Sequence, residues 1–493
     1  MEIMNIGNRR ELFWDDTIID TAQTTAEFRL HHPCRQQPVM TELGYGGYCS
    51  MIHDKEMGKY RIYYHIGGIR YAESSDGLNW EKPILGMYIE NNSRENNIVF
   101  RPEPDTSGFD GFDVMIDPRP ECPPDEKYKA MMRLNHSKDV DKPEFWIYIS
   151  SDGYNFKRGW MATDKAYGDS LNTIMWDESK QKFRMFLRGF HRSRFPDDKI
   201  VYRDIRATES DDCHNWTDPQ MLRYSTDTEY QMYTNNIMMY PRADHVLIGF
   251  PSRLTARYRW TANFEELCGR DRRWDFFNKG NFNTSEPNDG ARIALGISDT
   301  LFMTSRDTLN WTRYEEAFLS PGPENPKNWL YGGLYLAHGL IETPDIYPGS
   351  DNQYSMYCFN NRFFEGPAYL DRYTIRLDGF VSKHAGAREE RVVTKPFIFS
   401  GREMYLNFAT SGNGSVYIAM RTLDGQNSCE TCELFGDSCN RRVTFTKFNG
   451  SVKDYRLDGF NEPAESSFAD MEGKPVYLDI RLRDADIYSF KFE

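Results

Sequence analysis

The sequence predicts an all-β protein, a five-bladed β-propeller followed by a β-sandwich domain, and three observations carry this prediction. A turn motif recurs along the first three quarters of the chain, a second hairpin pattern precedes each copy, and both patterns stop near residue 387. Beyond that point the chain still alternates apolar and polar residues, but it no longer repeats. Radial repetition of a small sheet is typical of propellers, whereas an unrepeated run of alternating strands is typical of a sandwich.

The turn motif first reads "YAESSDGLNWEKP" (71–83). It returns as "IYISSDGYNFKRG" (147–159), "IRATESDDCHNWTDP" (205–219) and "FMTSRDTLNWTRY" (302–314), with a weaker fifth copy, "YTIRLDGFVS", from Tyr373. Asp-Gly is turn chemistry, because Gly tolerates a positive φ and Asp bonds back to its own backbone. We therefore expect each copy to be the outer hairpin of one blade, with its aromatic residue packed behind the turn.

A second hairpin pattern lies upstream of each turn motif. Each copy is a short apolar strand, an acidic or Pro/Gly turn and a second strand, as in "GYCSMIHDKEMGKYRIYYHI". The copies start at residues 47, 112, 171, 234 and 333, so that the first four are 59 to 65 residues apart and the last follows after 99. Two hairpins make a four-stranded blade. The long last interval predicts an insertion at 261–290, which we expect to be a loop at the rim.

These patterns divide the chain into a propeller (1–387) and a C-terminal sandwich (388–493). From about Glu389 the segments "REMYLNFAT", "GSVYIAMRTLDG" and "PVYLDIRLRDADIYSFKFE" alternate without repeating. About 100 residues of such strands make a sandwich. The segment "ELFWDDTIID" near the N-terminus is also strand-like. We expect it to close the propeller ring by pairing into the last blade, because this removes an open sheet edge.

Composition restricts the classes of function. The 493 residues include 74 acidic and 60 basic side chains, and the formal charge of -14 argues against nucleic acid or an anionic membrane as a partner. The longest apolar runs fall short of the roughly 20 residues that span a bilayer. Aromatic residues make up 15% of the chain, and its mean hydropathy is -0.71. This combination favours strands around a polar pocket.

The N-terminal and cysteine patterns bear on compartment and cofactors. The opening "MEIMNIGNRRELFWDD" contains no apolar segment of a signal peptide. The sequence as it stands therefore predicts a cytoplasmic protein, or a secreted or periplasmic one if a signal was removed. The nine Cys are expected to be reduced thiols. The segment "SCETCELFGDSC" holds a single CxxC, whereas zinc usually takes four ligands, so we expect no metal and no other cofactor.

Five blades, an appended sandwich and "SxDGxxW" turns together resemble glycoside hydrolase clan J and the related family 43. More closely, the chain resembles family 32-like proteins of bacterial genomes, through "YAESSDGLNWEKP", "WDESKQKFRMFL", "YTIRLDGF" and "RLRDADIYSFKF". The resemblance covers nearly the whole chain and implies a glycoside hydrolase with a carbohydrate substrate. The chain departs from that family at two motifs, because it lacks both the Asp-Pro-Asn-Gly nucleophile segment and the Arg-Asp-Pro triplet.

Cleavage of a glycosidic bond uses two carboxyl groups, one protonated and one ionised. Residues that open the inner strands of a propeller line one mouth, where ligands collect. By analogy with the three-carboxylate layout of propeller hydrolases, Asp113 is the expected transition-state stabiliser or pKa tuner. Asp169 and Glu229 compete for the role of general acid. Glu42 is the expected base or nucleophile, and Asp16 is its rival if the N-terminal strand reaches the axis.

Aromatic and polar side chains beside these carboxylates are expected to hold the sugar, since tyrosines offer flat faces for stacking. Arg253 and Arg188 follow second strands of their hairpins, where they would bind hydroxyls or a carboxylate, or else form ion pairs within the fold. The expected substrate-binding residues are Tyr45, Tyr48, Asp110, Asn172, Tyr233, Asn235, Arg253 and Tyr335.

The sequence leaves three functions open. The first is an exo-acting glycoside hydrolase that removes a terminal sugar in an axial pocket closed by the insertion. The second is a propeller that binds carbohydrate without cleaving it. The third is a sialidase, because "SSDGLNW" resembles an Asp-box, although sialidases use an arginine triad and six blades. A fold by itself does not decide among them.

Overall fold

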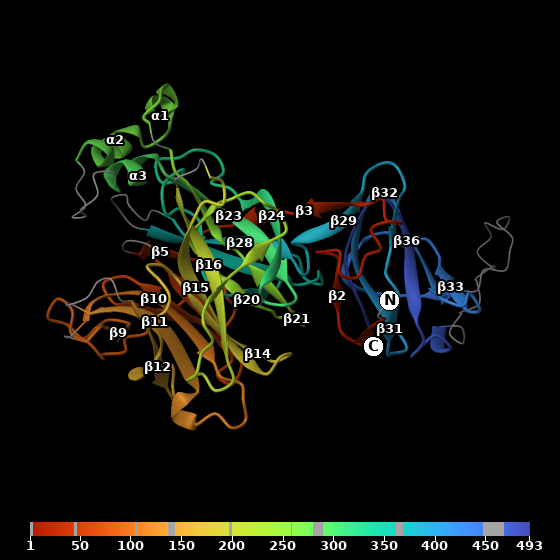
Figure 1. Cartoon of the computed structure of the whole chain (residues 1–493), viewed down its shortest axis with the longest axis horizontal. Helices are drawn as coiled ribbons and strands as arrows, with labels where there is room; N and C mark the ends of the chain where they lie inside the picture. Colours follow the sequence, from red (N-terminus) through yellow and green to blue (C-terminus); the bar gives the residue numbers. More distant parts are fainter. Residues whose placement is uncertain are drawn as a thin grey trace.

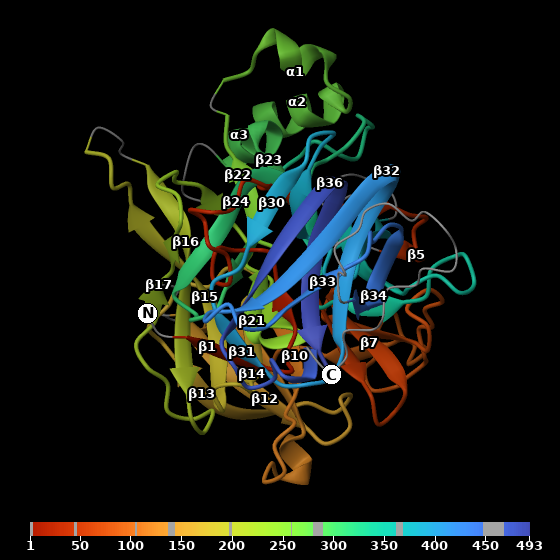
Figure 2. The ribbon, with the colours of Figure 1, turned by 90° about the vertical axis from the view of Figure 1, so that its right-hand side faces the viewer.

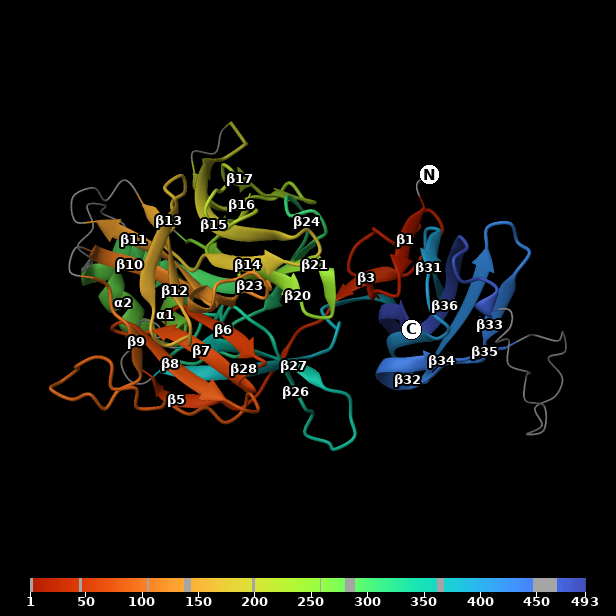
Figure 3. The same cartoon turned by 90° about the horizontal axis from the view of Figure 1, so that it is seen from below.

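The computed structural model describes residues 3–43, 47–103, 106–136, 143–196, 200–257, 259–279, 289–360, 368–446 and 468–493. Among these residues, five sheets follow one another along the chain, and a larger sheet combines strands from both ends of the sequence. Figures 1 and 3 show the five sheets gathered on one side, with the larger sheet beside them. The fold is thus the predicted all-β architecture, a propeller-like arrangement with a β-sandwich.

The first three sheets are four-stranded antiparallel meanders, as the paired hairpins predict. A 3₁₀ helix, η1 (Pro124–Glu126), precedes the second strand of the second sheet. The first sheet contains β6 (Cys49–Asp54), β7 (Lys59–His65), β8 (Ile69–Ser74) and β9 (Ile98–Phe100). The second contains β10 (Thr106–Ile116), β11 (Tyr128–His136), β12 (Glu144–Ser150) and β13 (Lys157–Thr163), and the third contains β14 (Thr173–Asp177), β15 (Lys182–Arg192), β16 (Val201–Ser210) and β17 (Gln220–Met221).

The turn motif has the predicted chemistry. In the second sheet it joins β12 to β13, and Asp152 accepts hydrogen bonds from the backbone nitrogens of Tyr154 and Asn155 at 2.8 and 2.9 Å. The residue after the aspartate has a positive φ in all four complete copies, at Gly77, Gly153, Cys213 and Thr308. A side chain at Gly153 would meet Arg61 Nη1 at 2.3 Å, so glycine is required there by space as well as by backbone conformation.

The fourth and fifth sheets are larger than a simple meander. The predicted insertion lies within the fourth sheet, and its described residues form helices α1 (Ala262–Glu266), α2 (Arg270–Lys279) and α3 (Asp289–Leu295) where a loop was expected. The fourth sheet contains β18 (Arg223–Tyr224), β19 (Gln231–Met232), β20 (Ile237–Tyr240), β21 (Ala243–Gly249), β22 (Ser252–Thr255), β23 (Ile297–Ser305) and β24 (Asn310–Leu319). The fifth contains β25 (Tyr335–Leu336), β26 (Ile341–Thr343), β27 (Gln353–Phe359), β28 (Ala368–Arg376), β4 (Cys34–Arg35) and β5 (Met40–Leu43).

Ring closure corrects two expectations. The outer strand of the fifth sheet is supplied by β4 and β5, which pair with β28. The segment expected in that role lies earlier, and its strand β2 (Glu11–Leu12) pairs instead with the C-terminal strand of the larger sheet. The weak fifth turn motif, after β28, likewise leads out of the propeller, because the next strand, β29 (Val381–Ala385), joins the larger sheet.

The larger sheet forms the sandwich and includes N-terminal strands. Phe, Leu, Ile and Val side chains of the long strands β32 and β36 fill its core. The boundary near residue 387 stays a prediction, and the pairing adds β1 to β3 and β29 to the C-terminal sheet. Its strands are β1 (Met4–Gly7), β2, β3 (Glu27–Leu30), β29, β30 (Glu390–Val393), β31 (Phe397–Phe399), β32 (Met404–Thr422), β33 (Ser428–Thr431), β34 (Asp437–Val443), β35 (Phe445–Thr446) and β36 (Val476–Phe492).

Buried charges fix the sandwich to the propeller. Glu11 of β2 is fully buried and pairs with Arg306 of the fourth sheet's turn at 2.8 Å and with His245 at 3.4 Å. Burial alone would raise the pKa of Glu11, but the hydrogen bond from His245 and the charge of Arg306 outweigh it and lower the pKa to about 2. The Glu11 carboxylate is therefore ionised at neutral pH, and its contact with Arg306 is a salt bridge.

Candidate functional site

The propeller axis is crossed by a hydrogen-bond network centred on Asp113. Its Oδ1 lies 2.7 Å from His338 Nδ1, and its Oδ2 accepts the backbone N–H of Ile174 at 2.8 Å. His338 Nε2 lies 2.9 Å from the carbonyl oxygen of Ile237. Ser50 Oγ in turn accepts the N–H of Val114 at 3.0 Å. The network thus joins all five sheets at their inner strands.

Asp113 and His338 are closed off from solvent. Asp113 is 0% exposed and His338 is 7% exposed. Burial lowers the pKa of His338, but the charge and hydrogen bond of Asp113 outweigh burial and raise it above its ordinary value. Because both carboxylate oxygens of Asp113 are bonded within the protein, its geometry favours a structural role. The catalytic role expected of Asp113 stays a prediction.

Asp169 lies in different surroundings at the mouth, just before β14. Half of its side chain is exposed, and its Oδ1 lies 2.6 Å from Nη1 of Arg188, whose own side chain is 1% exposed. Arg188 also donates to the carbonyl oxygen of Tyr233 and stands 4.4 Å over the ring of that residue. Burial would raise the pKa of Asp169, but the charges of Arg188, Arg203 and Arg133 outweigh it and lower the pKa. Asp169 is therefore ionised.

Four tyrosines pack together next to this ion pair. Tyr335 stacks on Tyr48 at 5.8 Å and on Tyr233 at 5.2 Å between ring centroids. Tyr331 meets Tyr233 edge-on at 5.5 Å. Ile293 of α3 belongs to the same cluster, and Phe276 of α2 packs against it. The predicted tyrosines are thus brought together from three sheets, and the helices of the insertion cover them.

Asp110 supplies a second carboxylate near Asp169. It pairs with Arg133 at 3.0 Å, and its side chain is 31% exposed. Gly111 lies against the segment that follows Asp169, because a Cβ there would stand 3.1 Å from the carbonyl oxygen of Ser170. Arg133 also acts electrostatically on Asp169. One arginine therefore serves two carboxylates on neighbouring sheets.

Glu229 is placed away from this pair. Its carboxylate lies 3.3 Å from His191 Nε2, accepts the Ser193 hydroxyl at 2.7 Å and pairs with Arg194 at 3.1 Å. Burial would raise the pKa of Glu229, but the hydrogen bonds from Ser193 and Arg194 lower it. It lines a side cavity of about 420 Å³ between the third and fourth sheets. An ionised carboxylate with these partners lacks the proton of a general acid, so this role stays an untested expectation that the geometry does not favour.

The remaining predicted residues either form contacts within the fold, are exposed away from the mouth, or have side chains that the structure does not describe. Arg253 forms the ion pair that was the alternative expectation, with Asp299 at 2.5 and 2.9 Å. Asn172 and Asn235 are buried, and their amides bond the backbone of β15. Asp16 is exposed in the turn that follows β2, a strand of the sandwich sheet. Tyr45 and the side chain of Glu42 lie outside the described part of the chain.

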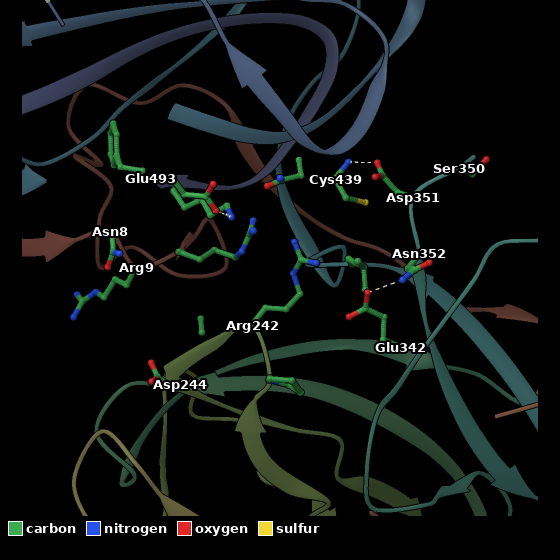
Figure 4. A pocket seen from close by; sticks show the side chains of 17 residues that line it. Asn8, Arg9, Arg242, Asp244, Glu342, Ser350, Asp351, Asn352, Cys439 and Glu493 are labelled. Carbon is green, nitrogen blue, oxygen red and sulfur yellow. Dashed lines mark hydrogen bonds and ion pairs between the residues drawn. The ribbon is translucent and has the colours of Figure 1, made fainter. Parts of the chain in front are cut away.

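A large polar cavity of about 870 Å³ lies between the propeller and the sandwich (Figure 4). Its polar groups are mostly bonded to one another. Glu342 accepts the side-chain amide of Asn352 at 2.8 Å, and Asp351 accepts the backbone N–H of Cys439 at 2.5 Å. Behind them the fully buried Asp378 pairs with Arg10 and Arg242, both at 3.0 Å. The cavity is therefore lined by polar residues of both the propeller and the sandwich.

Sequence reasoning missed the arginines that shape the mouth. Arg133 and Arg203 stand in the middle and at the start of long strands, where nothing in the local pattern marks them. Among the described residues no group of three or more His, Cys, Asp or Glu side chains is arranged to hold a metal ion. No helix in the described part of the chain is long and apolar enough to cross a membrane.

Comparison with protein-family models and with curated proteins finds no match. Solved structures similar to this chain include Bombyx mori GH32 β-fructofuranosidase, with 9% identity, a TM-score of 0.40 and 94% of each chain covered. Sucrose-6-phosphate hydrolase from Lactobacillus gasseri has 11% identity and a TM-score of 0.39, with 96% of this chain and 94% of that chain covered. A GH130 glycoside hydrolase that targets β-1,2 mannosidic linkages in Candida mannan has 13% identity and a TM-score of 0.40, with 71% and 96% covered.

Proposed function

We propose that this protein is a glycoside hydrolase that removes a terminal sugar at the propeller mouth. The observation that carries the proposal is the ionised, half-exposed carboxylate of Asp169 beside stacked tyrosines. The half-exposed carboxylate offers a charged group to the hydroxyls of a sugar ring, and the tyrosines packed beside it are themselves buried, at 2–6% exposed. Ile293 and Phe276 of the insertion helices pack against these tyrosines, so the insertion closes one side of the site, which suits a chain end better than the middle of a polymer.

Asp169 was expected as a general acid, but its lowered pKa leaves it without the proton for that role. In this proposal it therefore acts as base or nucleophile, and Asp110 is the second carboxyl group. Arg188 holds Asp169 in place and keeps it ionised. Arg133 links the two carboxylates, so that binding of substrate near Arg133 changes the environment of both. Glycosidases of either stereochemical class use such a pair, with the separation of the two carboxyl groups deciding the outcome.

The test is hydrolysis of a panel of aryl glycosides and oligosaccharides by the wild type, Asp169→Asn and Asp110→Asn. Asp218→Asn is the matched control, because the replaced carboxylate is 78% exposed and pairs with a surface lysine, Lys165. We expect release of a single sugar by the wild type and the control, and loss of at least about 10²-fold in kcat/KM in both mouth variants. Full activity in Asp169→Asn would remove the proposed site.

A non-catalytic, carbohydrate-binding propeller is the second candidate. It is favoured by one observation: at the mouth, Asp169 and Asp110 are both paired with arginine. Arginine favours the ionised form of a carboxyl group, whereas a general acid must hold a proton. Sugar binding by the wild type without turnover of any substrate, weakened in Asp169→Asn, would establish this reading in place of hydrolysis.

A further inference from the structure

The side cavity of about 420 Å³ between the third and fourth sheets is rich in arginine. Its volume lies within the about 300–1,000 Å³ of sites for small molecules. Five of the residues that line it are arginines, although the chain as a whole has a formal charge of -14. These residues are Arg192, Arg194, Arg203, Arg223 and Arg313. Positive charge gathered in one cavity of an acidic protein concentrates anions there.

The carboxylates of this cavity are covered, whereas three of its arginines are open to solvent. Asp204 and Glu229 are lining residues, but their side chains are only 2% and 4% exposed. The side chain of Arg194 is 47% exposed, and Arg192 and Arg223 are exposed as well. The charge that the cavity offers to a ligand is therefore mainly positive.

Part of the positive charge around the cavity is offset within the protein. The ion pairs are Arg194 with Asp227 and Glu229, at 2.9 and 3.1 Å, Arg206 with Asp204 at 3.0 Å, and Arg313 with Glu315 at 3.5 Å. Asp204 and Glu229 also hold His191, whose hydrogen bond to Asp204 raises its pKa. Three arginines and this histidine are thus offset by four carboxylates.

The other three lining arginines have no carboxylate partner among the residues that the structure describes. Arg203 donates from Nη1 to the side-chain oxygen of Gln231 at 3.0 Å, which is a neutral acceptor. The side chains of Arg192 and Arg223 form no hydrogen bond or ion pair within the described part of the chain. Arg203 also acts electrostatically on Asp169 at the mouth. Even if its charge is assigned to the mouth, two positive charges at the cavity are left without a counter-charge.

The guanidinium group selects the chemistry of the ligand. Its planar fork donates two parallel hydrogen bonds to the oxygens of a carboxylate or a phosphate. A carboxylate carries one negative charge, whereas a phosphate monoester carries close to two at neutral pH, because its second pKa is about 6. Two or three arginines without a counter-charge therefore match a phosphate group better than a carboxylate.

The walls of the cavity are aromatic and already held in place. The guanidinium carbon of Arg313 lies 4.4 Å from the ring centroid of Tyr224 and 4.8 Å from that of Tyr230, and both tyrosines line the cavity. Arg313 is itself fixed, because it donates to Thr226 Oγ1 at 2.8 Å and to the carbonyl oxygen of Thr228 at 2.6 Å. A preformed site binds with little loss of conformational entropy.

We infer that the side cavity binds the phosphate group of a small molecule, with Arg192 and Arg223 as its principal partners and Arg203 as a further positive charge. The ligand is either inorganic phosphate or a phosphorylated monosaccharide, since both carry the group that the arginines recognise. The site does not depend on hydrolysis at the mouth.

The first experiment is isothermal titration calorimetry of the full chain at about pH 7 with inorganic phosphate, glucose 6-phosphate, glucose and glucuronate, each to about 10 mM. We expect one or both phosphates to bind, glucuronate to bind more weakly and glucose not to bind. Tighter binding of inorganic phosphate identifies the free ion as the ligand, and tighter binding of glucose 6-phosphate identifies the phosphorylated sugar. Absence of binding by both phosphates, or equal binding of glucuronate, overturns the inference.

A second comparison places the phosphate in the cavity. The double variant Arg192→Gln/Arg223→Gln should weaken phosphate binding at least about tenfold, because charge-assisted hydrogen bonds are lost. Both replaced residues are exposed, so the fold is retained. Arg388→Gln is the matched control, since Arg388 is exposed between β29 and β30 and forms no ion pair with the described residues. Equal binding by the double variant, or an equal loss in the control, contradicts the site.

Arg133→Gln separates the cavity from the mouth, where Arg133 pairs with Asp110. This variant should bind phosphate as the wild type does. Loss of binding in Arg133→Gln, with the double variant unaffected, would move the phosphate to the mouth and overturn the inference.

Discussion

Asp113 at the propeller axis is 0% exposed with both oxygens bonded, whereas half of the Asp169 side chain at the mouth is exposed. Asp113 lies in β10 and Asp169 lies just before β14 of the next sheet, with three strands, β11 to β13, between them in the chain. Asp113 links four sheets through His338, Ile174 and Ile237. Asp169 has a buried arginine on one side and open space on the other. A carboxylate inside an inner strand thus holds the fold, whereas one just before an inner strand is exposed and available to a ligand.

The largest effect is expected at the axis. Asp113→Ala leaves His338 buried without its partner and leaves the N–H of Ile174 unbonded, and such losses cost about 3–5 kcal/mol of the free energy of unfolding. Urea denaturation measures it. His338→Ala made in the Asp113→Ala background should add far less than it costs alone, because the two act as a unit. A loss below about 1 kcal/mol in Asp113→Ala would break the comparison.

At the mouth the order of effects is reversed. Asp169→Asn should lower kcat/KM at least about 10²-fold, equivalent to about 2.7 kcal/mol of transition-state stabilisation, while stability falls by only about 1 kcal/mol because Asn still accepts from Arg188. Asp113→Asn should lower stability but retain kcat/KM per folded molecule. Steady-state kinetics alongside urea denaturation test this crossed pattern. Loss of activity in folded Asp113→Asn would instead place Asp113 in the catalytic machinery.

A pH titration sharpens the comparison further. The pKa of His338 in the folded state is raised, so the stability it contributes is complete below its unfolded pKa of about 6.5 and is lost as pH rises through the folded value. The free energy of unfolding should therefore fall as the pH rises above about 6.5, with a slope no steeper than about 1.4 kcal/mol per pH unit for one proton. In Asp113→Asn this slope should be reduced. Equal slopes in the two proteins would show that Asp113 is not what raises the pKa of His338.

The smallest effect is expected at a turn far from both regions. Asp152→Ala removes the bonds to Tyr154 and Asn155 that fix one outer hairpin, at a cost of about 1 kcal/mol. Activity and sugar binding should not change. Thermal unfolding and kinetics measure these two expectations, and the variant serves as the reference for a carboxylate with a purely local role. A loss of stability as large as that of Asp113→Ala would show that the turns contribute as much stability as the axis.

Local sequence patterns predicted the features that depend on residues close together in the chain, such as the turns and the starts of the inner strands. The turns of four sheets follow from an aspartate that accepts the backbone N–H two residues further on, and Gly follows that aspartate in two of them. The tyrosines that open the inner strands meet because such positions converge. The outer strand of the fifth sheet could not be predicted in the same way, because Gln36 and its partner Thr374 are separated by 338 residues. The sequence that follows β28 still has the pattern of a blade hairpin, although the chain there already enters the sandwich.

The site was harder to predict than the fold because burial and pairing decide it. Glu229 precedes a short strand that pairs with β22 beside the inner strand, so its carboxylate meets His191 and Arg194 away from the axis. Arg192 and Arg223 sit in ordinary strands, and their lack of a carboxylate partner among the described residues follows only from how the third and fourth sheets pack. No spacing in the sequence distinguishes them from the many arginines that are paired.

The pairing of β4 and β5 with β28, which closes the propeller ring, also has a consequence for biosynthesis. A ribosome that adds about 5–20 residues per second needs roughly 20–70 s to make the 338 residues between Gln36 and Thr374. During that time β4 and β5 have left the ribosome without the strand they will pair with. Four sheets can form in order as they emerge, but the ring stays open until the fifth arrives. A nascent chain stalled before residue 368 would therefore display an unpaired strand edge, and chaperones that recognise such edges should bind it more than the completed protein.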